Sequence, residues 1–511
     1  MQLLVASNQS ERPNIFYHVK ALTTNNGEML FRKLLYVLLG KLTVSFVLRV
    51  PMGLNARGLE ENLWQLSALP IDSQNDSEGW ATTSLVEKDR HPEYIIHWKG
   101  EGVDGYSLQF RHLEFRGALS AVLETSVVDV AFEDALDYTG SVELQASKLV
   151  QFNSAMQYIH IPRNIHRKSL VEAAERCSLI HALYDIVSAS DAYPPLASSA
   201  IQNNGFGDMY SGSQNEEATW CVRVRRFGQS LCSEKEKRYG ARARSMKLEK
   251  EALKALEPLL LQFGGKVNLN SPDCKIYIFD GLVRTDKVLA RRITSGPRVF
   301  AIAPNTRICV TNTPLCPVAA FLLCNVAGIR KIVSILDPYV GSGAILLAAA
   351  MIQPSCRSVG IEIADNGYVN RDDILLDFDT RNLTRPLALL HGDSTNELMR
   401  EEAKKAIGND AFDLIITDPP YGIRESSNYN TLTPAEELFQ SIAKDRDLGR
   451  RLLKKGGRLV CFVPCNEDEN LEDVLPSREQ AESAGLQCEV VREQPLNDSL
   501  SRWLVSYLCV R

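Results

Sequence analysis

The chain has 511 residues, enough for two to four domains, and its 45% hydrophobic and 23% charged residues are typical of a soluble globular protein. A formal net charge of −6 excludes a uniformly basic nucleic-acid-binding protein, although a local basic patch stays possible. The 12 cysteines are scattered, with no CxxC pair and no histidine at zinc-finger spacing, so we expect reduced cysteines and no metal site.

Residues 1–103 give few functional signals and are left as an unassigned N-terminal segment. Met1–Ser10 lacks the basic start and long apolar run of a signal peptide. The most apolar stretch, Leu34–Val50, has Lys41 near its middle and is marginal for a bilayer, so it predicts a buried helix or a strand pair. Tyr94–Trp98 is a candidate strand. We expect a soluble, cytoplasmic protein with no membrane partner.

Residues 104–190 are expected to form an α+β N-terminal domain. The alternating YSLQF from Tyr106 predicts a strand, and HLEFRGALSAVLE after it has apolar residues at helical spacing. Lys168–Val187 predicts an amphipathic helix. Ser188–Glu217 is rich in Ser, Asn, Gly and Pro and predicts a flexible loop.

Residues 218–305 are expected to form a second small α+β domain. Trp220–Phe227 alternates as a strand, and Lys247–Phe263 predicts a helix in which Pro258 can cause a kink. Two further strands are expected at Val267–Leu269 and Lys275–Phe279. Strand, helix, strand, strand is the order of a small mixed domain.

Positive charge is concentrated in this second domain. Residues 221–250 contain ten Lys or Arg and three Asp or Glu, and residues 284–307 contain six and one. Such a concentration suits phosphate contacts along RNA, although an ordinary solvated helix face is the plain alternative. Arg223 and Arg225 alternate on one strand face, which favours a directed patch. The candidate RNA-binding residues are Arg223, Arg225, Arg226, Lys235, Lys237, Arg238, Arg242, Arg244, Arg291 and Arg292.

Residues 311–511 alternate between strand and helix patterns. Strands are expected at 332–336, 358–363, 387–390, 412–417, 458–464, 489–492 and 503–510, and helices at 344–351 and 438–454. This rhythm predicts a doubly wound, Rossmann-like α/β domain whose last strand is antiparallel.

A glycine loop, Asp337–Gly343, follows the first of these strands. Gly341 and Gly343 let the backbone turn tightly and approach a ligand, but the loop is neither a full dinucleotide fingerprint nor a phosphate loop. Asp337 suits a cationic ligand, such as the sulfonium amino acid of S-adenosylmethionine. Glu362 and Asp393 end the next two strands, where they are suited to ribose hydroxyls and an adenine amine. Each acid alone can be a solvated strand end, whereas three together favour a nucleoside cofactor.

Asp418, Pro419, Pro420 and Tyr421 follow the strand at 412–417. The two prolines stiffen the backbone and remove two amide donors, which leaves carbonyl and carboxylate acceptors for the two hydrogens of an exocyclic amine. Tyr421 offers a ring for stacking a base turned out of its helix. A Pro-Pro turn capping a strand is the plain alternative for these residues alone. Their place after a glycine loop and three strands favours an amino-methyltransferase.

The run TDPPYGIRE (Thr417–Glu425), together with DPYVGSG at Asp337–Gly343, resembles the eukaryotic tRNA (guanosine-10 N2-)-methyltransferases. Thr313–Phe321, Arg226–Gly228 with Asn270–Asp273, and His112–Arg116 also resemble segments of that family, the middle pair in its THUMP-containing RNA-binding region. Within the catalytic domain, Ala364 departs from the family's usual second acid. By position, the resemblance assigns the cofactor S-adenosyl-L-methionine to Asp337, Tyr339, Gly341, Gly343, Glu362 and Asp393, and the target guanine to Asp418, Pro419, Pro420 and Tyr421.

The resemblance implies methyl transfer to the N2 amine of a guanosine at position 10 of tRNA. It also implies a THUMP-like domain at 218–305 and a small zinc-binding activator subunit that forms a heterodimer with this chain. Two alternatives stay open: a DNA or rRNA amino-methyltransferase, and a non-catalytic RNA-binding subunit with a methyltransferase fold.

Overall fold

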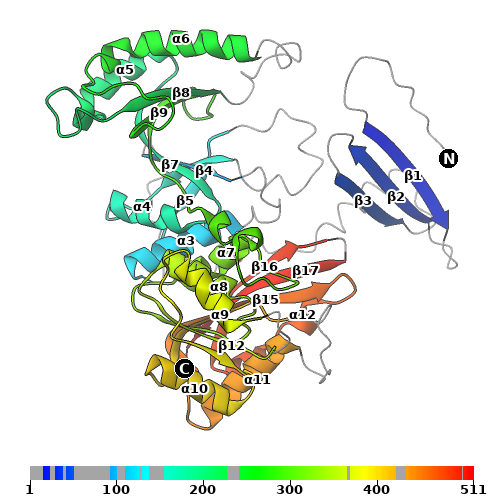
Figure 1. Ribbon diagram of the computed structural model, residues 1–511. Coiled ribbons are helices and arrows are strands. Elements are labelled where there is room, and N and C mark those ends of the chain that lie inside the picture. Colours follow the sequence, from blue (N-terminus) through cyan, green and yellow to red (C-terminus); the bar gives the residue numbers. More distant parts are fainter. Residues whose placement is uncertain are drawn as a thin grey trace. The chain divides into compact units, whose positions relative to one another are not determined.

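A computed structural model describes residues 15–23, 29–37, 42–50, 93–99, 110–125, 128–136, 155–226, 241–364, 369–421, 433–497 and 499–510. The chain divides into two compact units, Met1–Ser84 and Leu85–Arg511. The first holds an antiparallel sheet in the order β1-β2-β3, formed by Ile15–Thr23, Met29–Val37 and Leu42–Val50 (Figure 1). The apolar stretch at 34–50 is therefore a strand pair, the second of the two expected forms. No helix in the described part of the chain is both long and apolar enough to span a bilayer.

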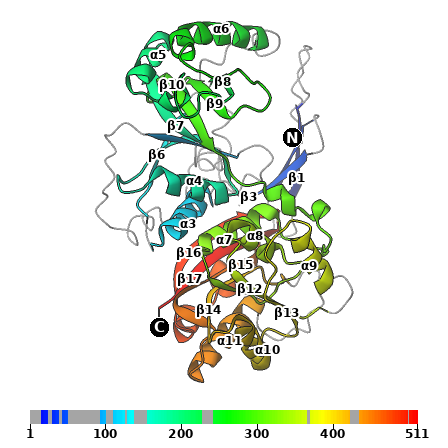
Figure 2. The ribbon, with the colours of Figure 1, turned by 60° about the vertical axis from the view of Figure 1, so that its left-hand side comes forward.

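The second unit begins with a seven-stranded sheet in the order β5-β6-β4-β7-β10-β9-β8, called here the mixed sheet (Figure 2). Only β8 and β9 pair in parallel. The pairing of β7 with β10 joins segments 104–190 and 218–305 into one sheet. The strands are β4 Tyr94–Trp98, β5 Ala131–Asp134, β6 Met156–His160, β7 Ile180–Ser190, β8 Trp220–Arg226, β9 Cys274–Asp280 and β10 Lys287–Thr294; the helices are α3 Arg111–Leu123, α4 Arg167–Arg176, α5 Tyr193–Gln202 and α6 Ala241–Leu260.

Two predictions in this region are wrong. The helix expected over Lys168–Val187 ends at Arg176, and β7 begins at Ile180 because this segment lies buried between β4 and β10. Burial in the middle of a sheet outweighs local helical spacing. The loop expected at Ser188–Glu217 contains α5, whose prolines occupy the first turn, where a helix loses no hydrogen bond to them. It also contains a short 3₁₀ helix, Gly207–Met209.

The helix predicted at Lys247–Phe263 is confirmed as α6, with Pro258 inside it. The strand predicted at Val267–Leu269 is reduced to a single bridge between Val267 and Trp220. The strand predicted at YSLQF covers residues 106–110, of which 106–109 lie outside the described residues. The last, Phe110, directly precedes α3.

The second seven-stranded sheet has the order β13-β12-β11-β14-β15-β17-β16, and β17 is its antiparallel strand (Figure 1). This confirms the doubly wound α/β domain and its antiparallel last strand. The strand order reverses between β11 and β14, and the crevice beyond such a switch point is where these sheets bind ligands. The strands are β11 Ser334–Asp337, β12 Arg357–Glu362, β13 Ala388–His391, β14 Phe412–Thr417, β15 Leu453–Asn466, β16 Leu486–Pro495 and β17 Leu500–Cys509.

Helices cover both faces of this sheet. One apolar core contains residues of α7, α8 and α9, and the other contains residues of α10, α11 and α13. The helix predicted at 438–454 ends earlier, because Gly449 adopts a φ of 72° and Leu453 opens β15. The helices are α7 Pro317–Ala327, α8 Ala344–Ile352, α9 Arg371–Asp379, α10 Glu397–Ile407, α11 Pro434–Asp447, α12 Leu471–Val474 and α13 Arg478–Ser483, with 3₁₀ turns at Val299–Ile302 and Pro304–Thr306.

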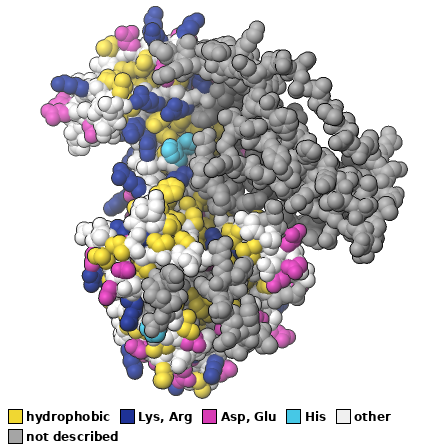
Figure 3. All heavy atoms as spheres, turned by 45° about the vertical axis from the view of Figure 1, so that its right-hand side comes forward, with side chains coloured by type: hydrophobic (Ala, Val, Ile, Leu, Met, Phe, Trp, Pro, Cys, Tyr) yellow, Lys and Arg dark blue, Asp and Glu magenta, His cyan; other side chains and the backbone are white. Residues whose placement is uncertain are grey.

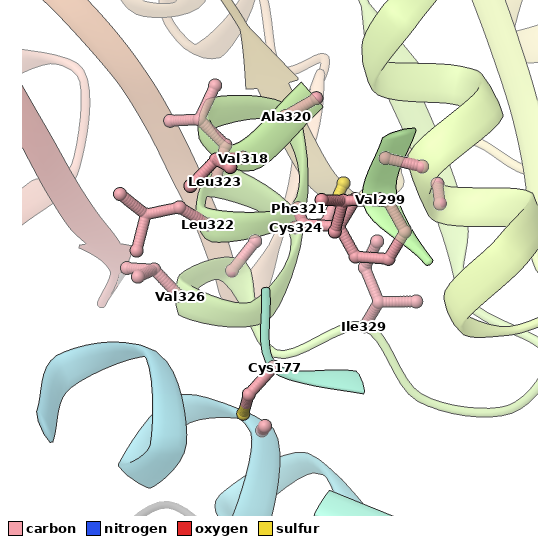
Figure 4. Packing of buried hydrophobic residues seen from close by; sticks show 14 of the residues in the cluster. Cys177, Val299, Val318, Ala320, Phe321, Leu322, Leu323, Cys324, Val326 and Ile329 are labelled. Atoms are coloured by element: carbon pink, nitrogen blue, oxygen red, sulfur yellow. The ribbon is translucent and has the colours of Figure 1, made fainter. Parts of the chain in front are cut away.

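A buried joint connects the mixed sheet to the second sheet. Helix α3 packs on α7, and one apolar cluster runs from Trp98 through α7 to the second sheet; Figure 4 shows Cys177 and Val299 on different sides of α7. At its centre the buried Glu114 carboxylate accepts hydrogen bonds from Ser178 N at 2.7 Å, Ser178 Oγ at 2.6 Å, Leu179 N at 3.0 Å and Asn325 Nδ2 at 3.0 Å. Among the described residues, one apolar cluster is therefore shared by the mixed sheet and the second sheet.

Candidate active site

Asp337 ends β11 and lies almost completely buried at the base of the glycine loop. Its Oδ1 accepts hydrogen bonds from Thr417 Oγ1 at 2.8 Å and Tyr339 N at 3.2 Å, while its buried Oδ2 has no hydrogen-bond partner within the described residues. Burial raises the pKa of Asp337 to about 7, and the charges of Asp418 and Glu362 add to the rise. The structure therefore brings together three of the predicted site carboxylates.

The two loop glycines adopt backbone angles that other residues avoid. Gly341 has a φ of 49° and Gly343 a φ of 81°. A Cβ on Gly343 would lie 2.9 Å from Ile374 Cγ2, whereas a Cβ on Gly341 would meet nothing within 4 Å. The loop backbone is therefore packed at Gly343 and open at Gly341, which leaves room for a ligand at Gly341.

Glu362, at the end of β12, supports the loop from the neighbouring strand. Its Oε2 accepts from Gly341 N at 2.8 Å and its Oε1 from Ala364 N at 2.8 Å. A carboxylate has about four acceptor positions, so each oxygen can still take a hydroxyl donor. Ala364, the departure from the family pattern, thus contributes its backbone amide where the family usually has an acid.

Asp393 follows β13 and is exposed, with Oδ1 accepting from the amide and hydroxyl of Thr395, each at 2.8 Å. Glu437, near the start of α11, lies close by: burial raises its pKa and the charge of Asp393 raises it further. Tyr339 donates its hydroxyl to Pro434 O at 3.0 Å and so fixes the loop against α11. The sequence analysis did not identify Glu437, because nothing local relates α11 to the strand ends.

The catalytic loop is held by a residue from β17. Tyr421 donates its hydroxyl to Asp418 Oδ1 at 2.7 Å and receives a hydrogen bond from Arg502 Nη1 at 3.2 Å. Arg502 is itself fixed, since its Nε donates to Gln494 at 2.9 Å and its guanidinium lies 3.9 Å from the centroid of the Phe462 ring. Burial raises the pKa of Asp418, and the positive charge of Arg502 opposes this rise.

Arg307 supports the glycine loop from behind. Its fully buried side chain donates from Nη2 to the Ser342 carbonyl, and its Nε lies 3.8 Å from Asp377 Oδ2. Its Nε and Nη1 have no hydrogen-bond partner in the described part of the chain. Sequence analysis counted Arg307 only as part of a basic stretch, because its contact with Ser342 exists only in the folded chain.

These residues fit S-adenosylmethionine. The unpartnered Asp337 Oδ2 suits an ammonium group, the open backbone at Gly341 gives a ligand access, and Glu362 retains acceptor capacity for ribose hydroxyls. Gly422 and the rest of the run to Glu425 lie outside the described residues. The individual site assignments stay predictions.

The described candidate RNA-binding residues divide between the two faces of the mixed sheet. Arg226 lies 3.5 Å from Asp280, and Arg291 pairs with Asp208 at 2.7 Å. Lys235, Lys237 and Arg238 lie outside the described residues, and nothing is described of the Arg242 and Arg244 side chains on α6. The remaining three are Arg223, Arg225 and Arg292.

The order of the second sheet, a glycine loop after β11 and an Asp-Pro-Pro-Tyr loop after β14 define the C-terminal part of the chain as a Rossmann-like S-adenosylmethionine-dependent methyltransferase domain. In agreement, residues 304–488 match the family model UPF0020, described as an RMKL-like methyltransferase domain. The expected resemblance to tRNA (guanosine-10 N2-)-methyltransferases is also confirmed. The chain is 24% identical over 323 residues to tRNA (guanine(10)-N(2))-methyltransferase TRMT11 of Gallus gallus, covering 53% of this chain and 65% of that protein.

Two further relatives span shorter segments. The tRNA (guanine(10)-N2)-dimethyltransferase of Methanothermobacter thermautotrophicus is 27% identical over 217 residues, covering 42% of this chain and 57% of that protein. The release factor glutamine methyltransferase of Caulobacter vibrioides is 32% identical over 154 residues, covering 27% of this chain and 48% of that protein. The matches therefore leave at least a third of each relative uncovered.

Proposed function

We propose that this protein transfers a methyl group from S-adenosylmethionine to the exocyclic N2 amine of guanosine 10 in tRNA. Two of the three relatives above carry names that specify this base and position. The observation that carries the proposal is the hydrogen bonding of the two Asp418 carboxylate oxygens. Its Oδ1 is held by Tyr421, and within the described residues its Oδ2 makes no hydrogen bond, so it is available to an amine N–H.

The residues of this chain position two reactants. When bound, S-adenosylmethionine supplies an electrophilic methyl group on its sulfonium. Asp337 and Glu362 would hold the cofactor's ammonium and ribose ends. Asp418 and the Pro419 carbonyl accept the two amine hydrogens, which points the nitrogen out of the loop and restricts its motion. The nitrogen becomes cationic only after transfer and then loses a proton readily, so Asp418 need not be a strong base.

A second candidate function is methylation of a glutamine side chain in a protein. The release factor glutamine methyltransferase is the most identical of the relatives described, and a primary amide offers the same pair of hydrogens as an exocyclic amine. The paired loops alone do not separate the two substrates. The basic residues of the mixed sheet favour a nucleic acid over a protein as the substrate. The resemblance of its segments to a THUMP-containing RNA-binding region favours RNA over DNA. The transfer assay described below distinguishes a tRNA amine from an rRNA amine as the methyl acceptor.

We further propose that the chain is the catalytic subunit of a cytoplasmic heterodimer with a small zinc-binding activator, as the family resemblance implies. A partner of this kind covers apolar surface, and Ile363, Leu387 and Leu398 are exposed by 65%, 50% and 74% close to β13, the edge strand of the catalytic sheet. We expect coexpression with the activator to increase solubility and transfer. Equal activity with and without it would contradict this proposal.

The test of function is transfer of a labelled methyl group to four substrates: unmodified tRNA transcript, rRNA fragment, duplex DNA and release factor. Each is assayed with and without the activator. We expect label in tRNA, lost when guanosine 10 is replaced by adenosine. Asp418→Asn should abolish transfer while cofactor affinity changes less than about threefold. Label in the release factor or DNA but not in tRNA would overturn the proposal.

A further inference from the structure

The arginines of β8 and β10 point alternately to the two faces of the mixed sheet. Leu289 packs in the core with α5 and α6, whereas Val288 and Ala290 pack in a separate cluster on the opposite face. Because side chains alternate along a strand, Arg291 lies on the helix-covered face and Arg292 on the opposite face. Arg225 lies on the same opposite face, since it is paired with Phe279 of that cluster.

Of the four arginines Arg225, Arg226, Arg291 and Arg292, the two on the helix-covered face lie beside carboxylates, and the two on the opposite face have no such neighbour in the described part of the chain. On the helix-covered face Arg291 binds Asp208 through two hydrogen bonds, at 2.7 and 2.9 Å, and Arg226 lies beside Asp280. On the opposite face, neither Arg225 nor Arg292 makes an ion pair or hydrogen bond in the part of the chain that the structure describes. Arg225 is also exposed.

Two histidines lie near these two arginines. His97 on β4 and His181 on β7 lie with ring centroids 4.8 Å apart and ring planes at 73°, and the ladder places His97 opposite Ala182 of the same cluster. The pKa of His97 is lowered to about 4, chiefly by burial and in addition by its neighbours His181, Arg111, Arg225 and Arg292. Burial also lowers the pKa of His181, together with Arg292, Lys99 and Arg225. Every one of these charges is positive, which is the electrostatic character of a site that takes an anion.

We propose that Arg225, Arg292, His97 and His181, called here the bare basic face, bind the phosphodiester backbone of the RNA substrate. This inference rests on the proposed function, because the same four groups without an RNA substrate define only an anion site. In Figure 3, Lys and Arg side chains gather beside histidine on the upper part of the molecule, which holds the mixed sheet. Two uncompensated arginine cations beside two histidines are complementary to neighbouring phosphates.

The position of the histidines places this face toward the catalytic domain. His97 and His181 lie at the ends of β4 and β7 that adjoin the Glu114 joint: Lys99, two residues after His97, donates to Ser178 O at 2.7 Å. Ser178 itself binds Glu114. A backbone bound here therefore passes along the route between the mixed sheet and the methyltransferase domain. Phosphate contacts of this kind set the register of the RNA and leave base choice to the catalytic loop.

The experiment compares the Arg225→Gln, Arg292→Gln double variant with wild type in binding an unmodified tRNA transcript at several salt concentrations. Loss of two phosphate contacts should lower the slope of log Kobs against log[salt] by roughly two. The matched control is Arg167→Gln, an arginine of α4 that is not among the candidate RNA-binding residues and pairs with Asp185 at 2.7 Å. We expect its slope to stay within about 0.5 of wild type. An equal effect of Arg167→Gln, or none in the double variant, would overturn the inference.

The histidines add a second readout. A bound phosphate favours the charged imidazolium and opposes the lowering effect of Arg111, Arg225, Arg292 and Lys99. Wild-type affinity for tRNA should therefore rise as pH falls from 7 toward 5, and His97→Gln, His181→Gln should flatten that rise. Affinity with the same pH dependence in both proteins would contradict the role of the histidines. A wild type that binds no tRNA overturns the proposed function as well, whereas failure confined to the variants overturns this inference alone.

Discussion

At the scale of single residues, the site is a set of groups kept in unfavourable states. Among the described residues, one oxygen of the buried Asp337 and two nitrogens of the buried Arg307 have no hydrogen-bond partner. A buried polar atom without a partner costs on the order of 1–3 kcal/mol. The sequence predicted Asp337 and Asp418 because each directly follows a recognisable strand. It could not predict Arg307 or Arg502, because these reach the loops across tertiary contacts that no local pattern records.

We expect Asp337→Asn to stabilise the protein and weaken cofactor binding. The folded pKa is about 7, well above the unfolded value, so ionised Asp337 destabilises the fold above pH 7 and this cost disappears as pH falls toward 4. At pH 8 the variant should unfold at a higher temperature than wild type, with a free energy of unfolding larger by on the order of 2 kcal/mol. At pH 4.5 the two proteins should differ little. Thermal unfolding at the two pH values measures this. A variant that is less stable than wild type at pH 8 would show that the ionised Asp337 carboxylate stabilises the fold, contrary to this prediction.

Arg502 should act as a positioning residue for the catalytic loop. Arg502→Gln removes the donor to Tyr421, so Asp418 loses part of its fixed orientation. We expect kcat to fall by roughly ten- to a hundredfold while the Kd for S-adenosylmethionine stays within about threefold. Because the positive charge of Arg502 also lowers the pKa of Asp418, its loss should move the acidic limb of the pH–rate profile upward. A profile that does not move, with Kd raised instead, would assign Arg502 a purely structural role.

At the scale of helices and strands, the prediction succeeded where an element's own apolar spacing determines its form. It failed where packing against neighbouring strands determines whether a segment is helix or strand. The strand predicted at 412–417 matches β14, and α8 and α3 were recognised from apolar spacing. Ile180–Val187 was assigned to a helix because its apolar residues also fit helical spacing, and only its neighbours β4 and β10 make it a strand. The pairing of β7 with β10, which unites two predicted domains, likewise has no local signal.

The close approach of α3 and α7 depends on Gly117. A Cβ there would lie 2.4 Å from the Asn325 carbonyl oxygen, a backbone atom that cannot move aside cheaply. Gly117→Ala should therefore destabilise the protein by roughly 1–3 kcal/mol, although alanine is intrinsically the better helix former. Ser120→Ala on the same helix is the control and should be neutral or stabilising. Denaturant unfolding measures both, and a stabilised Gly117→Ala would show that the helices can separate without cost.

At the scale of the whole second unit, the mixed sheet and the methyltransferase domain are connected by buried residues. Glu114 receives donors from both sides, from Ser178 and Leu179 on one and Asn325 on the other. The apolar cluster continues across the same joint. We therefore expect residues 85–511 to unfold as one cooperative body, since separate transitions require a boundary that few contacts cross.

Removing the charge at the joint tests this. Glu114→Gln turns one acceptor oxygen into a donor that faces existing donors, so we expect a loss of about 2–4 kcal/mol and, in calorimetry, a single transition that splits into two. Glu172→Gln, on the exposed side of α4, is the control and should change stability by less than about 0.5 kcal/mol. Two transitions already present in wild type would contradict the single body.

The hydrogen bond from Thr417 Oγ1 to Asp337 Oδ1 connects the cofactor loop to the residue that precedes Asp418. A cation bound beside Asp337 favours its ionised form, and an ionised acceptor holds the threonine hydroxyl more strongly. The two binding sites then share a coupling free energy, which must be reciprocal: the factor by which cofactor tightens RNA is the factor by which RNA tightens cofactor. We expect Thr417→Val to bring that factor closer to one.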